Sequence, residues 1–198
     1  MTNQKARSVL RNVRIPKELN DTLQREAQAE NRTVSALVVS ILTKFAEFDR
    51  FANKFGFVTV PRSNYYRMIE AMDEQTYSKA SDVAPATLLE MVRFWFGRVN
   101  ANTICDFAET TGKYAGTTRC QVKRSNGEYS ITFQHELGPK FSNILNRIFQ
   151  DSLSTLGIRP ETEVTNNSTF IRFSETRNTN AIRRMEDTGA IRTELSFR

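Results

Sequence analysis

The first fifty residues contain two different spacings of apolar side chains. Over residues 8–15 the apolar side chains Val9, Val13 and Ile15 are separated by even numbers of residues, which places them on one face of an extended chain. That spacing predicts a strand. After Pro16 the apolar residues recur every four positions, at Leu19, Leu23 and Ala27. This second spacing predicts an amphipathic helix, which Pro16 suits as a starting residue.

A second helix is expected after a break at Asn31, because Asn tolerates the left-handed conformation that ends a helix. Thr33 or Ser35 is expected to cap it. Its apolar face is broad and comprises Val34, Leu37, Val38, Ile41, Leu42 and Phe45. Phenylalanines continue this stripe at spacings of three and four, so the helix is expected to run on to Gly56.

The predicted strand needs a partner for its backbone N–H and C=O groups. No second strand is predicted before Phe57. The expected solution is pairing with the same strand of a second copy across a two-fold axis.

Strand, helix, break and helix in this order resemble the ribbon-helix-helix family of DNA-binding regulators, of the Arc and MetJ type. The resemblance covers residues 8–50. Its motif residues are Arg14-Ile15-Pro16 at the end of the strand, the Asn31-Arg32 break, and Thr33-Val34-Ser35 at the start of the second helix. It implies a homodimer whose two paired strands enter the major groove of double-stranded DNA.

In such a ribbon Val13 and Ile15 are expected to pack inward, so that Leu10, Asn12 and Arg14 face the bases. Arg14 suits guanine and Asn12 suits adenine, each with about 1–3 kcal/mol of discrimination. Leu10 departs from the polar pattern and offers only apolar contact, such as with a thymine methyl group.

Phosphate contacts are expected from two places. The resemblance puts a phosphate at the start of the second helix, where Thr33, Val34 and Ser35 present free N–H groups and the positive end of the helix dipole. The basic arm supplies the second set, Lys5, Arg7 and Arg11. Arg11 is a departure, since it places a charge on the face of the strand that should pack. The net charge of +6, with no acid in residues 1–17, agrees with an anionic partner.

The remainder predicts an α+β fold: helices followed by a small antiparallel sheet with a helix on one face. The expected elements are a short strand at 57–60, a helix capped by Ser63, a helix from Pro85 to Gly97, a helix over 101–111, strands at 117–123 and 129–134 around an Asn-Gly turn, a helix from Gly138 to Gly157, and strands at 161–165 and 169–173. The predicted domains are 1–55 for DNA binding and dimerisation, 56–112 as a helical connecting region, 113–175 as a ββαββ domain, and 176–198 as a polar tail.

The sequence offers little catalytic or metal-binding chemistry. His135, Cys105 and Cys120 are scattered rather than closely spaced, so neither a metal nor another cofactor is expected. The chain has a single histidine, and the sequence does not put any acidic residue beside it, which argues against an enzyme. The cysteines are expected as small core residues. The longest apolar run is too short for a membrane span and the N-terminus lacks a signal core, which favours a cytoplasmic protein.

The function expected from these features is sequence-specific DNA binding by a homodimeric transcriptional regulator such as a repressor, with higher oligomers on DNA and an effector or protein partner at the C-terminal domain. An antitoxin-like protein with autoregulatory DNA binding is one alternative. A small-molecule sensor or enzyme built on residues 85–175 is the other.

Overall fold

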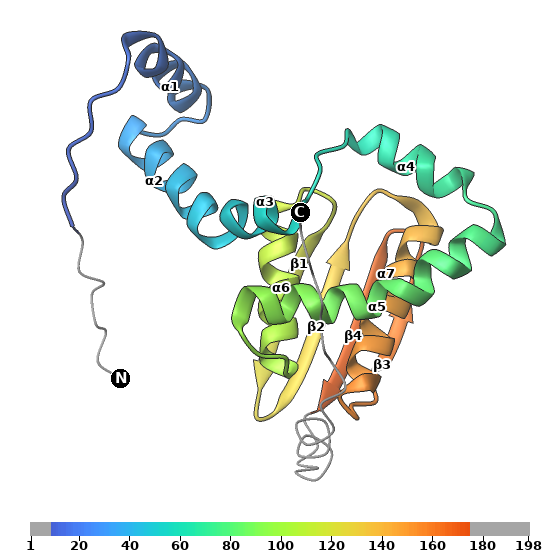
Figure 1. Ribbon diagram of the computed structural model, residues 1–198. Helices are drawn as coiled ribbons and strands as arrows, with labels where there is room; N and C mark the ends of the chain where they lie inside the picture. The colour runs from blue at the N-terminus through green and yellow to red at the C-terminus, as the bar shows by residue number, and fades with distance from the viewer. Residues whose placement is uncertain (1–8, 175–198) are drawn as a thin grey trace, which may run out of the picture. The chain divides into compact units, whose positions relative to one another are not determined.

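The computed structural model describes residues 9–174, and the chain divides into two compact units, Met1–Ala46 and Glu47–Arg198. In the first unit, residues 9–16 form an extended segment without regular secondary structure, followed by helices α1 (Lys17–Ala29) and α2 (Val34–Lys44) (Figure 1). Both helix predictions are confirmed.

The turn between α1 and α2 has the predicted conformation. Asn31 has a φ of +51°, in the left-handed region that Asn tolerates. The Thr33 side chain accepts a hydrogen bond from the backbone N–H of Ala36 at 3.2 Å, so Thr33 rather than Ser35 caps α2.

The predicted continuation of the second helix is also confirmed. A π-helical turn, η1 (Phe45–Asp49), follows α2, and α3 (Arg50–Phe55) then ends at Gly56, whose φ is +87°.

The second unit combines helices with one sheet (Figure 1). Its remaining helices are α4 (Arg62–Ala71), α5 (Glu74–Phe96), α6 (Ala101–Tyr114) and α7 (Gly138–Thr155). Its strands are β1 (Arg119–Ser125), β2 (Glu128–Gln134), β3 (Glu161–Val164) and β4 (Ser168–Ser174). They form an antiparallel sheet in the order β1-β2-β4-β3. The α+β class and the ββαββ order are therefore confirmed.

One face of this sheet lies against helices α6 and α7. The residues that pair across the strands on this face are apolar or small, and they are Cys120, Val122, Tyr129, Ile131, Phe133, Thr169, Ile171 and Phe173. The predicted Asn-Gly turn joins β1 and β2, and Asn126 and Gly127 have φ values of +51° and +82°, as a tight turn of this type requires.

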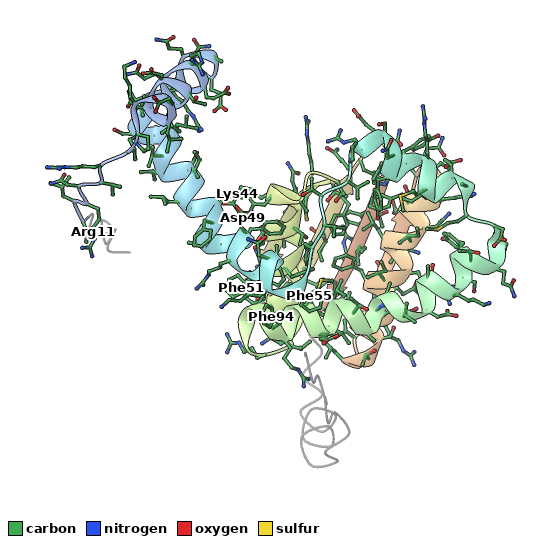
Figure 2. The ribbon with its side chains drawn as sticks, turned by 45° about the horizontal axis from the view of Figure 1, so that its top comes forward. Arg11, Lys44, Asp49, Phe51, Phe55 and Phe94 are labelled. Carbon is green, nitrogen blue, oxygen red and sulfur yellow. The ribbon has the colours of Figure 1, made fainter. Side chains whose placement is uncertain are left out.

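An aromatic cluster joins η1, α3, α5 and α6. Trp95 is buried, and its ring centroid lies 5.2 Å from that of Phe51 and 5.5 Å from that of Phe107. Figure 2 shows Phe51 together with Phe55 and Phe94 where α3 meets α5. The Trp95 indole N–H donates to the carbonyl of Glu47. The aromatic residues near Trp95 thus serve as core.

Two predictions near the start of the second unit are wrong. Residues 57–60 are not a strand: within residues 9–174 no other segment pairs with them, and a strand requires a partner. Ser63 does not cap a helix, because α4 begins one residue earlier and Pro61 occupies the capping position without a side-chain hydrogen bond.

Pro85 and Gly112 were both predicted as helix boundaries, and both lie inside helices. α5 begins eleven residues before Pro85, where the Asp73 carboxylate accepts from the N–H of Thr76 at 2.7 Å. Gly112 lies within α6 because the helix packs closely on β1: a Cβ atom at this position would stand 2.3 Å from the Cβ of Cys120. The close approach of α6 to β1, rather than the end of a helix, accounts for this glycine.

The predicted connecting region, 56–112, shares a core with the sheet. Val92 and Trp95 of α5 and Ile104 of α6 belong to the same buried cluster as Ile131 and Ile171. The second unit therefore begins at Glu47 and includes these helices.

Candidate nucleic-acid interface

The extended segment before α1 is exposed along its whole length. Val9 is 73% exposed, Leu10 85% and Val13 77%. The predicted strand is not formed in the single chain: all strands among the described residues lie between 119 and 174. The physical reason is the one that the sequence suggests, since an isolated strand has no acceptors or donors for its backbone.

The predicted base-contacting residues, Leu10, Asn12 and Arg14, are all exposed and none is in a helix. In the single chain, however, the segment has no inner and outer face. Val13, expected to pack inward, is about as exposed as Leu10, expected to face outward. The sorting of these side chains into two faces thus remains a prediction that only a second copy can test.

Arg11 lies on the same exposed segment (Figure 2). In the single chain its charged side chain is exposed to solvent, so the charge is not buried. The other two basic residues predicted to contact phosphates, Lys5 and Arg7, lie outside the described residues.

The start of α2 offers hydrogen-bond donors. Thr33 uses its Oγ1 to accept from Ala36, and its carbonyl accepts from the N–H of Leu37. Within residues 9–174, the N–H groups of Val34 and Ser35 donate to no acceptor. These two N–H groups and the positive end of the helix dipole are features that favour an anion.

Arg32 is a cation beside this helix start that the sequence identified only as part of the break. Its Nη2 donates to Ser40 Oγ at 3.0 Å, and its Nε forms an ion pair with Glu30 at 2.8 Å. Arg32 therefore braces the α1–α2 turn, while the ion pair with Glu30 offsets much of its charge. The signal in the sequence was its position between two helices, directly before a capping residue.

The apolar face of α2 is only partly covered. α1 and α2 bury Ala27 and Leu37. Four other apolar residues of this helical stretch are exposed: Val39, Ile41, Leu42 and Phe45. A surface of this kind on a two-helix unit indicates that a further element completes it.

His135 is buried and held by two hydrogen bonds. Its Nδ1 accepts from the N–H of Leu137 at 3.2 Å, so the proton of the neutral ring lies on Nε2, which donates to Ser142 Oγ at 2.9 Å. Burial lowers the pKa of His135. With its proton on Nε2, His135 has no free lone pair toward Ser142 and is not placed to act as a base on that hydroxyl.

Cys105 and Cys120 both lie on the buried side of α6 and β1, in line with the expectation of small core residues. Burial raises the pKa of each thiol to about 12. Both are therefore protonated near neutral pH and poor metal ligands or nucleophiles. Within the described range, no three His, Cys, Asp or Glu side chains group closely enough to hold a metal ion.

Neither a protein-family model nor a curated protein matches this chain. Among residues 9–174, no helix combines the length and apolar character needed to cross a membrane.

Proposed function

We propose that this chain is a sequence-specific DNA-binding regulator that acts as a homodimer, with the 9–15 segments of two copies paired as a ribbon in the major groove. One observation carries the proposal. The N-terminal unit has the predicted helices and the predicted turn, yet the apolar residues of its extended segment and of α2 are exposed. This is what one half of a two-fold unit is expected to look like.

The exposed apolar residues suffice to hold two copies together. They are Val9, Val13, Ile15, Leu19, Val39, Ile41, Leu42 and Phe45. Covering the exposed part of each contributes about 1 kcal/mol, hence on the order of 15 kcal/mol for two copies. Association costs about 4–15 kcal/mol in lost freedom of motion. Strand pairing adds hydrogen bonds for the backbone of residues 9–15, which supports a stable dimer.

Within the paired ribbon, the alternation of side chains directs Leu10, Asn12 and Arg14 to the bases. The N–H groups of Val34 and Ser35, with the capping Thr33, then receive a phosphate that fixes the orientation of the protein on the duplex. Arg11, Lys5 and Arg7 contribute attraction that does not depend on sequence. In this proposal the second unit, with a core of its own, has a regulatory or assembly role and no catalytic one.

The test is binding of the full chain to duplexes selected from a random pool. We expect Arg14→Ala and Asn12→Ala to reduce the preference for the selected sequence by about 1–3 kcal/mol per contact, while affinity for unrelated duplexes changes little. Lys5→Ala or Arg7→Ala should weaken binding to all duplexes alike and reduce its salt dependence.

Arg25→Ala is a matched control, because Arg25 is an exposed arginine of the same unit that lies on α1 rather than on the segment. It should leave sequence preference unchanged. If Arg14→Ala and Lys5→Ala change binding in the same way, the proposed groove assignment is wrong.

A further inference from the structure

The open face of the sheet in the second unit carries charges that are sorted by strand. On this face the register places Lys123, Ser130, Arg172 and Glu161 in one row across β1, β2, β4 and β3. The next row contains Gln121, Thr132, Phe170 and Glu163. An open polar face is common on antiparallel sheets, but the arrangement of its charges is specific to each protein.

The two edge strands bear opposite charges. On β1 the open face presents Arg119 and Lys123, whereas on β3 it presents Glu161 and Glu163. All four side chains are exposed, and in the part of the chain that the structure describes none of them forms an ion pair. The sheet thus has a basic edge and an acidic edge on one face.

Lys123 and Glu161 cannot contact each other within a single sheet, although Arg172 of β4 lies directly opposite Glu161 in the register. Three strand spacings separate Lys123 from Glu161, about 14 Å at the usual distance between neighbouring strands. A direct contact between such residues requires a second molecule.

From this pattern we infer that the open face docks against the same face of a second copy, about a two-fold axis that runs parallel to the strands. Two arrangements bring identical sheet faces together with aligned strands. With the axis perpendicular to the strands, β1 faces β1 and β3 faces β3, so that like charges oppose. With the axis parallel to the strands, β1 faces β3 of the second copy, so that opposite charges meet. The charges select the second arrangement.

The rows of side chains match under this operation. Lys123 faces Glu161 of the second copy, and Gln121 faces Glu163, an amide donor opposite a carboxylate acceptor. In the middle, Arg172 faces Ser130 of the second copy. Glu128 lies two residues from Ser130 on β2, and within each copy it lines the same shallow hollow as Lys123 and Arg172.

The size of the face sets the strength of this association. Three strands of seven residues and one of four span about 400 Å² per copy, or about 800 Å² in total. This lies below the roughly 1,200 Å² of stable complexes and belongs to the transient class. The contact is therefore reversible and sensitive to salt. It does not rest on the proposed DNA-binding function: the sheet contact by itself joins two chains, and with pairing through the N-terminal unit as well it would join such dimers into larger assemblies.

The experiment is sedimentation velocity of the full chain over a concentration series at low salt, with charge-reversal variants. Lys123→Glu and Glu161→Lys each turn two attractive pairs per interface into repulsive ones, and each should weaken the association about tenfold or more. The double variant Lys123→Glu with Glu161→Lys restores opposite charges across the interface and should regain the association. Lys79→Glu is the matched control, an exposed lysine of α5 away from the sheet, and should have little effect.

Mixing the two single variants gives the sharpest result. One variant then carries only acidic residues at these two positions and the other only basic residues, so both cross-sheet pairs are attractive. Each variant should fail to associate through the sheet by itself, and an equimolar mixture should associate as the wild type does.

The inference is overturned if the wild type shows no association that depends on concentration, which is the result expected if another segment of the same chain covers this face. It is also overturned if the single variants associate less but their mixture does not recover. If the full chain associates through the sheet as expected but binds no DNA, that result contradicts the proposed function alone.

Discussion

The two units of this chain differ in how far they bury their apolar side chains. In the second unit, the sheet and helices bury Ile131, Ile171 and Val92 completely. In the first unit, α1 and α2 bury only Ala27 and Leu37, while Leu42 of α2 is 60% exposed. The second unit therefore has a large core within one chain, although Val58 and Val83 are exposed on it, and the first has the surface expected of a unit that needs another copy. The comparison indicates that concentration should control the stability of the first unit, whereas at high salt, where the inferred sheet contact is screened, it should not control that of the second.

The largest effect is expected from a charge placed on the uncovered surface of α2. Leu42→Glu should leave the single-chain fold intact, because the side chain is exposed there. In a dimer it would bury two carboxylates without partners, which costs several kcal/mol. We expect dimerisation through the N-terminal unit to weaken at least a hundredfold, as measured by sedimentation equilibrium, together with specific DNA binding.

Glu26→Gln serves as a control on the exposed side of α1 and should leave both properties unchanged. If Leu42→Glu dimerises as the wild type does, then α2 does not form the interface, and the contrast between the two units has another origin.

The next effect is expected inside the second unit. Ile131→Ala removes a fully buried side chain from the middle of β2 and should destabilise this unit by about 2–5 kcal/mol. Urea unfolding of the full chain at high salt, where the inferred sheet contact is screened, should show this loss in the transition of the second unit, at a midpoint that does not change with protein concentration. Ser130→Ala, on the open face beside it, should change stability by less than about 0.5 kcal/mol. A concentration-dependent midpoint for Ile131→Ala would mean that this core also depends on a second copy.

What the sequence predicts depends on where each element finds its partners. α1, α2 and the Asn126-Gly127 turn follow from spacing and turn chemistry within a few residues, and all were predicted. The segment 57–60 has strand-like composition but no partner, and composition alone cannot supply one. Gly112 was misread for a related reason, because its missing Cβ serves a close contact with the distant Cys120. Pro85 was misread because the cap at Asp73, which starts α5 well before it, was not recognised.

The candidate interface shows the same limit. The cap is local, and Thr33 was one of the two capping residues predicted, the other being Ser35. Which side of residues 9–15 faces DNA is a property of two chains, so neither the sequence nor one chain decides it. Arg32 was underestimated because its contact with Ser40, eight residues away, is not visible in a helical repeat.

The smallest effect concerns pH and the second unit. His135 is the single histidine of the chain, and burial lowers its pKa. In the unfolded chain a histidine titrates near 6.5. As the pH falls below that value, the unfolded state binds a proton that the folded state resists, so the second unit loses stability until the lower, folded pKa is reached. Above about pH 6.5 this contribution is absent. The carboxylates whose pKa is lowered, such as Glu47, change the stability of the fold in a more acidic pH range.

His135→Asn isolates this contribution, because its side-chain oxygen can still accept from the N–H of Leu137 while the titrating ring is gone. We expect urea unfolding of the wild type to show a midpoint that falls as the pH is lowered below about 6.5, and the variant to show a flatter profile over the same range. Ser142→Ala removes the hydrogen bond to Nε2 but keeps the ring, so it should retain the pH slope at a lower overall stability. If His135 opened to solvent before the unit unfolds, the unfolding midpoints of His135→Asn and of the wild type would change with pH in parallel. The core of the second unit would then be less self-contained than its buried residues indicate.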